Sequence, residues 1–353
     1  MARKVCVIPG DAASPEAVLP ALDVVQSLGC DIEWNVLPSG EQGQVEYGGK
    51  WAEVCSAAID AADTTWFGST GGKTPAIGYL RYGKGTYANV RPTKYMPGAL
   101  SPLARPEGID FVIVRENLED LYMGLEGELS ELEPMGFESR VTKRPLVGEP
   151  GRYAIKVITE KRTRAIVHFA CRLAMQRKAQ GFPGKVTVSG KYNVLPRTDG
   201  YFRAIAEEVV GEYPELAYEQ FITDDFARRI VATPHSLDVV VMPNLYGDIL
   251  SDEAAALVGG LGVAPSGCYG DDYAYFESVH GSAPDIMGRH IINPTATLLS
   301  AKLMLDHLGF EDAATRLESA VAMTYREGKA LTPDQGGTAH TEDFCEAVKA
   351  YLS

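Results

Sequence analysis

Two aspartates, Asp248 and Asp252, lie four residues apart in the stretch NLYGDILSDE, residues 244–253. In a helix this spacing places both carboxylates on one face, about one turn apart. Like charges in such positions repel each other by roughly 0.2–0.5 kcal/mol. The spacing leaves two explanations open: Asp248 caps the helix while Asp252 is solvated, or a cation lies between the two acids.

A third acid, Asp224, follows the strand-like run YEQFIT, and we expect it to lie near the other two at the ends of neighbouring strands. None of the three acids has a cysteine or histidine beside it in the sequence. A site made of carboxylate oxygens suits Mg²⁺ or Mn²⁺ better than zinc. From spacing alone, a metal site and a solvated acidic face are equally supported.

Four basic residues stand in comparable positions, near the ends of predicted strands. Arg115 follows the apolar run FVIV, and Arg81 and Arg91 flank the segment YGKGTYANV. A guanidinium group matches two carboxylate oxygens with its planar fork, although most single arginines are solvated or paired on the surface. Together with Lys191 and the acids, these residues suggest a site for a metal-bound polycarboxylate.

The elements that must position these residues alternate along the chain. Apolar, β-branched runs bounded by Gly, Asn and Pro predict strands, and longer stretches with helical periodicity lie between them. This alternation predicts an α/β fold, in which ligands gather at the carboxyl ends of the strands. The strands are expected in 4–10, 30–38, 63–69, 109–117, 185–191, 216–224 and 237–244, and helices in 14–29, 51–62, 158–177, 198–213 and 226–234.

The bulk properties narrow the class of protein. A chain of 353 residues has room for about two domains. Its net charge of −14 argues against nucleic acid as a partner, because a phosphate backbone requires a basic surface. The six scattered cysteines predict reduced thiols. Because the sequence contains no long apolar stretch, we expect no signal peptide and no membrane span. We therefore expect a cytoplasmic protein.

Two glycine-rich segments do not match the common nucleotide-binding patterns. GSTGGKTP, residues 68–75, fails the P-loop pattern because Phe67 stands where its first glycine is required, so a kinase is a weak alternative. GGLGVAP is not the GxGxxG fingerprint. A dinucleotide would therefore bind without a Rossmann fingerprint.

Five motifs in order resemble those of the β-decarboxylating dehydrogenases, which include the isopropylmalate, isocitrate, homoisocitrate and malate/tartrate dehydrogenases. The motifs are LRYGKGTYANVRP, VRENLEDLY, VSGKYNVL, NLYGDILSDE and VHGSAPDIMGRHIINP. The resemblance covers nearly the whole chain. It implies two α/β domains around a shared cleft: a larger cofactor-side domain of 1–99 plus 257–353, and a smaller dimerisation and metal-site domain of 100–256. The weakly patterned segment 126–153 would form an exposed arm.

The same resemblance assigns the acidic residues to a metal. Asp248 and Asp252 would bind one Mg²⁺ or Mn²⁺ ion together with Asp224. Asp224 and Lys191 would reach in from the second subunit of a homodimer. A cation shared in this way would remove the repulsion between the paired aspartates.

The implied reaction is oxidation of a (2R)-hydroxy-diacid followed by loss of a carboxyl group. Arg81, Arg91 and Arg115 would hold the malate carboxylates. Lys191 would act as the general base on the C2 hydroxyl, and Tyr122 would donate the proton that quenches the enol. A non-catalytic metal-binding protein, the alternative from another class, would need neither Lys191 nor Tyr122.

For the cofactor, the resemblance implies NAD⁺. A carboxylate at Asp285 can accept hydrogen bonds from ribose hydroxyls and would repel a 2′-phosphate. His280 is expected close to the adenine. The cofactor-binding residues implied are His280, Gly281, Ser282, Ala283, Pro284, Asp285, Ile286 and Asn293.

The segment TPAIGYLR, just before Arg81, is where relatives read the substituent on C3. Thr74, Ile77 and Gly78 are its implied substrate contacts, and Gly78 adds space but no charge. A third carboxylate would lose its obvious partner there, and burying an unpaired carboxylate is costly. We therefore expect a 3-alkyl- or 3-aryl-malate such as 3-isopropylmalate, with homoisocitrate, isocitrate and D-malate or tartrate as the alternatives.

Overall fold

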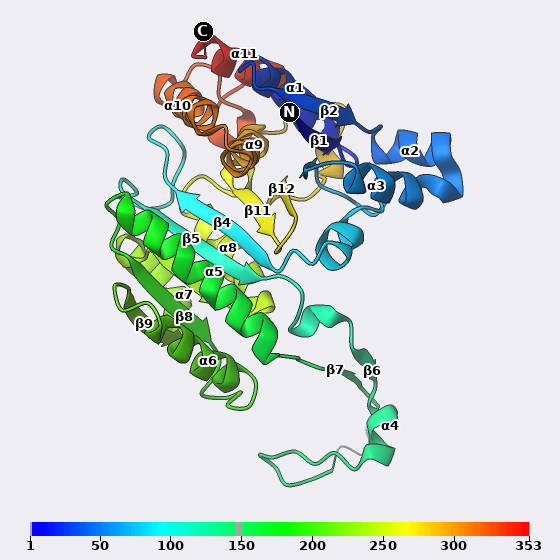
Figure 1. Cartoon of the computed structure of the whole chain (residues 1–353), viewed down its shortest axis with the longest axis vertical. Coiled ribbons are helices and arrows are strands. Elements are labelled where there is room, and N and C mark those ends of the chain that lie inside the picture. The colour runs from blue at the N-terminus through cyan, green and yellow to red at the C-terminus, as the bar shows by residue number, and fades with distance from the viewer. Residues whose placement is uncertain (1, 146–147, 149, 353) are drawn as a thin grey trace.

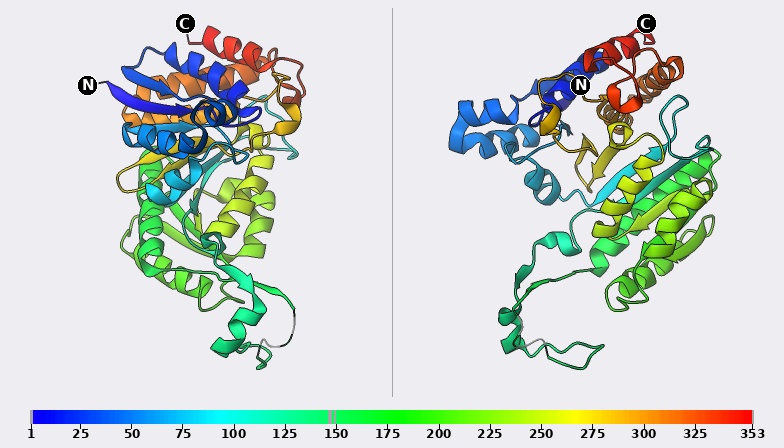
Figure 2. Two further views of the ribbon diagram at one scale, coloured as in Figure 1. Left: turned by 90° about the vertical axis from the view of Figure 1, so that its right-hand side faces the viewer. Right: turned by 180° about the vertical axis from the view of Figure 1, so that it is seen from behind.

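One ten-stranded sheet runs through the chain and carries helices on both faces (Figures 1 and 2). The structure, a computed structural model, describes residues 2–145, 148 and 150–352. The strand order is β2-β1-β3-β12-β11-β4-β5-β10-β8-β9. These strands are β1 (Arg3–Ile8), β2 (Ile32–Val36), β3 (Thr64–Phe67), β4 (Ala88–Lys94), β5 (Asp110–Glu116), β8 (Lys185–Gly190), β9 (Ala217–Ile222), β10 (Val239–Met242), β11 (Pro265–Tyr269) and β12 (Ala274–Ser278).

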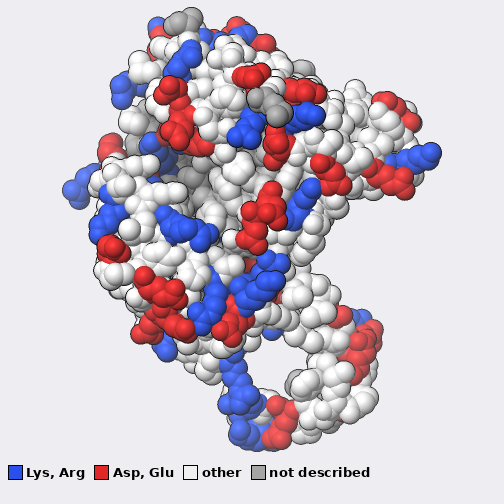
Figure 3. Space-filling view, viewed as in Figure 1, with Lys and Arg blue, Asp and Glu red and all other residues white. Residues whose placement is uncertain are grey.

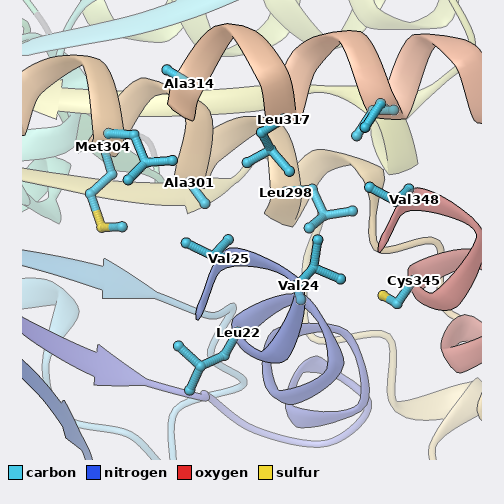
Figure 4. Packing of buried hydrophobic residues seen from close by; sticks show 14 of the residues in the cluster. Leu22, Val24, Val25, Leu298, Ala301, Met304, Ala314, Leu317, Cys345 and Val348 are labelled. Carbon is cyan, nitrogen blue, oxygen red and sulfur yellow. The ribbon is translucent and has the colours of Figure 1, made fainter. Parts of the chain in front are cut away.

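Alternate residues of β1 supply two separate cores. Val5 and Val7 face α1 and the C-terminal helices, whereas Cys6 and Ile8 face α3 on the opposite side of the sheet. Figure 4 shows the first core, where α1 lies against α9, α10 and α11. The helices around this end of the sheet are α1 (Ser14–Gln26), α2 (Gly40–Tyr47), α3 (Trp51–Asp60), α9 (Thr295–Leu308), α10 (Glu311–Glu327) and α11 (Thr341–Ala350).

The other end of the sheet follows the same rule along β10. Val239 and Val241 pack with α5 and α6, and Val240 and Met242 pack with α7 and α8. All four side chains are fully buried, which explains why this strand is a continuous apolar run. The helices here are α5 (Glu160–Ala179), α6 (Asp199–Gly211), α7 (Thr223–Ala232) and α8 (Asn244–Ala256).

The strands β5, β10, β8 and β9 are parallel neighbours in this order. Their carboxyl ends therefore meet at one edge of the sheet, where the predicted site residues follow. The expectation that Asp224 and Asp248 follow neighbouring strands is wrong, because β8 lies between β9 and β10. Two strand spacings separate the ends of β9 and β10 by about 10 Å.

Three strands at the centre of the sheet did not emerge from the sequence pattern. The strand β11 pairs antiparallel with both β12 and β4, and β4 pairs antiparallel with β5. These pairings join the two halves of the sheet and bring residues 265–278 between β3 and β4. Arg91 lies within β4, opposite Ile113 of β5, so the central strands carry part of the site.

A slender projection extends from the end of the molecule opposite to both termini (Figure 1). It contains the antiparallel pair β6 (Glu126–Glu128) and β7 (Arg152–Ala154) and the short helix α4 (Leu129–Leu132). Val141 is 91% exposed, and the space-filling view shows an opening between this projection and the body (Figure 3). The same view shows acidic and basic side chains interspersed over this face. Among the described residues, no helix has the length and apolar character needed to cross a bilayer.

Candidate active site

The paired aspartates of α8 converge on an arginine. Helix α8 begins at Asn244, so Asp248 lies in its second turn and does not cap it. Arg91 Nη1 lies 3.3 Å from Oδ1 of Asp248 and 3.3 Å from Oδ1 of Asp252, and it donates to Ser251 Oγ at 2.6 Å. The Arg91 guanidinium is therefore the positive charge that offsets the repulsion between the two aspartates within one chain.

Arg115 is the second cation of this group. Its side chain is 1% exposed, donates from Nε to Asn244 Oδ1 at 2.9 Å, and pairs through Nη1 with Asp248. Burial lowers the pKa of Arg115 to about 10, which still leaves it charged at neutral pH. Its Nη2 atom is buried and has no hydrogen-bond partner within the described part of the chain. A buried, unpaired guanidinium nitrogen indicates a place for an anionic ligand.

Tyr122 joins the same cluster from the turn that follows β5. Its hydroxyl donates to Asp248 Oδ2, and its ring lies 5.0 Å from the Arg115 guanidinium carbon. Burial alone would raise the pKa of Asp248, but Arg115, the Tyr122 hydroxyl and Arg91 outweigh it and hold that pKa below its ordinary value. The Asp248 carboxylate is thus kept ionised.

Arg81 is positioned by residues that the sequence reading missed. Its Nε donates to the Tyr275 hydroxyl at 3.4 Å, and its Nη2 lies 4.0 Å from Glu277 Oε1. Tyr275 and Glu277 belong to β12, whose central place in the sheet arises from long-range pairing. Glu277 does stand two residues before the cofactor motif that begins at Val279, but nothing in that spacing points to Arg81.

Lys191 and Asp224 form a second, separate group. Lys191 follows β8, and Asp224 lies in the first turn of α7 after the neighbouring strand β9, so their side chains meet and Lys191 Nζ donates to Asp224 Oδ1. No set of three His, Cys, Asp or Glu residues poised to hold one metal occurs among the residues described. Within a single chain the three predicted ligands are therefore not assembled.

The donors that are present nevertheless fit a hard divalent cation. Asp248 and Asp252 supply only oxygen atoms, and Arg91 already shows that both carboxylates point toward one positive charge. Asp224 would complete the set if it came from a second subunit.

The predicted substrate loop is held by a residue outside it. Asp11 is buried and accepts hydrogen bonds from Thr70 Oγ1 at 2.8 Å, from the Lys73 backbone nitrogen at 2.8 Å, and from the Thr74 hydroxyl. The hydroxyl proton of Thr74 is therefore committed to Asp11. Ile77 is partly buried against the core beside α3, whereas Gly78 is exposed, and a Cβ atom there would meet nothing within 4 Å.

The predicted cofactor loop lies against the N-terminal turn. The Ala13 backbone nitrogen donates to Ser282 O at 3.0 Å, and Ala12 adopts a φ of 52°, so an alanine occupies a backbone conformation that favours glycine. Ala283 is likewise left-handed, with a φ of 48°, ahead of the short turn Pro284–Ile286. The exposed residues Gly281 and Asp285 leave this loop open to a ligand.

Two polar residues of the loop differ in whether their side chains are free to form hydrogen bonds with a cofactor. His280 Nε2 is buried without a partner among the described residues, and burial lowers the pKa of His280. The Asn293 side chain is instead fully engaged: it donates to Tyr325 and Asp334 and accepts from the Thr295 nitrogen at 3.0 Å. Both side-chain amide hydrogens of Asn293 are therefore already used within the protein.

The site combines arginines, aspartate carboxylates and a lysine at the carboxyl edge of an α/β sheet. This combination is suited to a dehydrogenase that acts on a hydroxy acid. Comparison with known proteins makes the assignment specific. The model of the isocitrate/isopropylmalate dehydrogenase family matches residues 4–348, so the chain belongs to this family of NAD-dependent decarboxylating dehydrogenases (EC 1.1.1.-). The predicted family, fold class and enzyme class are confirmed.

Individual relatives span nearly the full length of the chain. The 3-isopropylmalate/3-methylmalate dehydrogenase of Methanocaldococcus jannaschii is 42% identical and covers 98% of both chains. The isocitrate/homoisocitrate dehydrogenase of Thermus thermophilus is 40% identical over 99% of this chain and 98% of its own. The crystal structure of isocitrate dehydrogenase from Methylococcus capsulatus superposes with a TM-score of 0.85 at 33% identity and covers 99% of both chains. These relatives divide between two substrate classes.

Proposed function

We propose that the protein oxidises and decarboxylates a (2R)-hydroxy-diacid whose C3 carries an alkyl or aryl group, such as 3-isopropylmalate. This proposal is carried by the C3 loop, where no cation is free of an acidic partner among the residues that the structure describes. Lys73 Nζ lies 3.3 Å from Glu41, the Tyr79 hydroxyl donates to Asp60 at 2.8 Å, and Thr74 donates to Asp11. Each candidate partner for a third carboxylate is already bound to an acid.

The three arginines support recognition of the malate part. Arg115 Nη2 is buried and unpaired within the described residues, so a substrate carboxylate would satisfy it. The Arg81 side chain is 22% exposed and lies beside Glu277, and the Arg91 side chain is 9% exposed and lies beside Asp248. A planar fork held in this way binds carboxylate oxygens and orients the C2 hydroxyl.

The proton transfers are assigned to Lys191 and Tyr122. Lys191 takes up the proton of the C2 hydroxyl, and Tyr122 delivers a proton to the carbon that has lost its carboxyl group. Asp224, Asp248 and Asp252 would hold Mg²⁺ or Mn²⁺, which would supply Lewis-acid chemistry when bound, and bound NAD⁺ would supply the hydride acceptor. The exposed Asp285 carboxylate supports NAD⁺ over NADP⁺, because it would repel a 2′-phosphate.

We further infer a homodimer with shared sites. Ile249 follows Asp248 on α8 and is 58% exposed, and Val194, three residues after Lys191, is 64% exposed. These apolar side chains beside the site support an interface there. Such an interface would bring the Lys191–Asp224 pair of one subunit to the Asp248 cluster of the other.

Two domains are part of the same proposal. The cores around β1 draw mainly on 1–99 and 257–353, and those around β10 draw mainly on 100–256. A cytoplasmic location is supported by the six cysteines, which are all free thiols.

A panel of substituted malates tests the substrate. We expect kcat/KM with NAD⁺ and Mn²⁺ to be highest for 3-isopropylmalate or a related 3-alkyl-malate, because the open Gly78 position admits an apolar group. Isocitrate, homoisocitrate and D-malate serve as the comparisons. A preference of about tenfold or more for isocitrate or homoisocitrate would overturn the substrate assignment and favour an isocitrate/homoisocitrate dehydrogenase activity.

Mixing two inactive variants tests the shared sites. Lys191→Met and Tyr122→Phe should each be nearly inactive alone. If the sites are shared, half of the random dimers from an equal mixture contain one intact site, so activity should return to about a quarter of wild type. Size-exclusion chromatography verifies dimer formation. A mixture no more active than its components would contradict the proposal that Lys191 of one subunit completes the active site of the other.

A further inference from the structure

Lys156 lies where the projection rejoins the body, between two buried acids. Its Nζ is 2.6 Å from Asp199 Oδ1 and 3.3 Å from Asp120 Oδ1. Both aspartate side chains are fully buried, and Lys156 itself is only 12% exposed. Two buried carboxylates around one ammonium would repel each other strongly without it, so this lysine holds together the segments that carry them.

Each acid also holds the backbone of a segment that leads to the site. Asp199 Oδ2 accepts from the Lys191 backbone nitrogen at 2.7 Å. Asp120 Oδ2 accepts from the Leu245 nitrogen at 3.0 Å, in the first turn of α8. A charged acceptor makes a stronger hydrogen bond than a neutral one, so these contacts fix where the Lys191 turn and the start of α8 lie.

Two further observations connect Lys156 to the Asp248 cluster. The Tyr246 ring lies 4.4 Å from Lys156 Nζ, and Tyr246 precedes Asp248 on α8 by two residues. Asp120 precedes Tyr122 by two residues. Its backbone has a φ of 68° and a ψ of −143°, a conformation that residues other than glycine rarely adopt. Strained backbone of this kind persists only where the surroundings enforce it, and here its carboxylate is held by Lys156 and Leu245.

From these contacts we propose that Lys156 is a positioning residue for the reaction. Through Asp120 it fixes the turn that carries Tyr122 and the start of the helix that carries Asp248, and through Asp199 it fixes the turn that carries Lys191. The inference rests on the proposed roles of Tyr122 and Lys191. If those residues serve different subunits of a dimer, Lys156 also links the two sites.

Hydrogen–deuterium exchange tests the positioning without any substrate. Asp199→Asn should raise exchange in the peptide that contains the Lys191 amide by about fivefold and leave that of Leu245 nearly unchanged. Asp120→Asn should do the reverse. Both variants are isosteric and keep one carboxylate for Lys156, so they should fold. Wild-type exchange at both amides in both variants would overturn the inference.

Turnover supplies the second measurement. Lys156→Met should lower kcat by about 10–100-fold while leaving the KM for NAD⁺ within about twofold, because the cofactor loop does not touch Lys156. Lys156→Arg, which keeps the charge, should recover part of this loss. The matched control is Lys302→Met on the remote helix α9, since Lys302 also bridges two acids, Asp306 of α9 at 2.9 Å and Glu318 of α10 at 3.5 Å.

The outcomes separate the two proposals. Wild-type kcat in Lys156→Met would refute the positioning role while leaving the dehydrogenase assignment intact. An equal loss in Lys302→Met would also refute it, because the effect would then be one of general stability. A wild-type protein that oxidises none of the malates would refute the proposed function, whereas the exchange experiment would still decide whether the two aspartates that Lys156 pairs with order the two turns.

Discussion

Replacing Lys191 with methionine is expected to lower kcat by about 10²–10⁴-fold, the range that a positioned acid or base contributes. Methionine preserves an unbranched side chain but cannot accept a proton from the C2 hydroxyl. Lys191 and Asp224 are 31% and 62% exposed, so solvent screens their ion pair and its loss should leave the stability nearly unchanged. The rate of NADH formation and the melting temperature, measured on one preparation, separate these effects.

The control for this experiment lies at the other end of β8. Lys185 begins β8, pairs with Glu219 at 2.9 Å, and is remote from the carboxyl edge of the sheet. Lys185→Met should therefore leave kcat close to wild type. If Lys191→Met also turned over at the wild-type rate, Lys191 would have no part in the chemistry, and the non-catalytic alternative would regain support.

The second large effect is expected from Asp248→Asn. The substitution removes a proposed metal ligand, and even the loss of an outer-shell partner typically weakens metal binding by about 10–100-fold. We therefore expect Mn²⁺ affinity to fall by at least this factor and NADH formation to become undetectable at ordinary Mn²⁺ concentrations. Calorimetric titration of Mn²⁺ into the protein measures the first quantity directly.

The same substitution should also destabilise the protein. Arg115 is buried and loses its carboxylate partner, and a buried group left unsatisfied costs about 1–3 kcal/mol. Asp306→Asn is the matched control, because Asp306 pairs with Lys302 at the partly exposed surface of α9. Undiminished Mn²⁺ binding in Asp248→Asn would place the metal elsewhere and would remove the basis of the proposed chemistry.

The sequence predicts the alternation of strands and helices because the periodicity of apolar residues is a local property of the chain. The run LDVVVMPN predicted β10 correctly, since a strand buried on both faces needs apolar residues at every position. The helix containing Asp248 and Asp252 was likewise predicted from their spacing. The central strands β4, β11 and β12 were missed because short, mixed segments become strands only through pairing with distant partners.

The sequence by itself determined the α/β alternation of strands and helices, the shared helical face of Asp248 and Asp252, and the motifs that mark the family. Only the tertiary structure decided that β8 separates β9 from β10, that Arg91 lies between the two acids, and that Lys156 joins the turns beside the site. The reason is physical: side-chain periodicity is set by neighbours along the chain, whereas strand order and buried ion pairs depend on contacts between residues far apart in sequence.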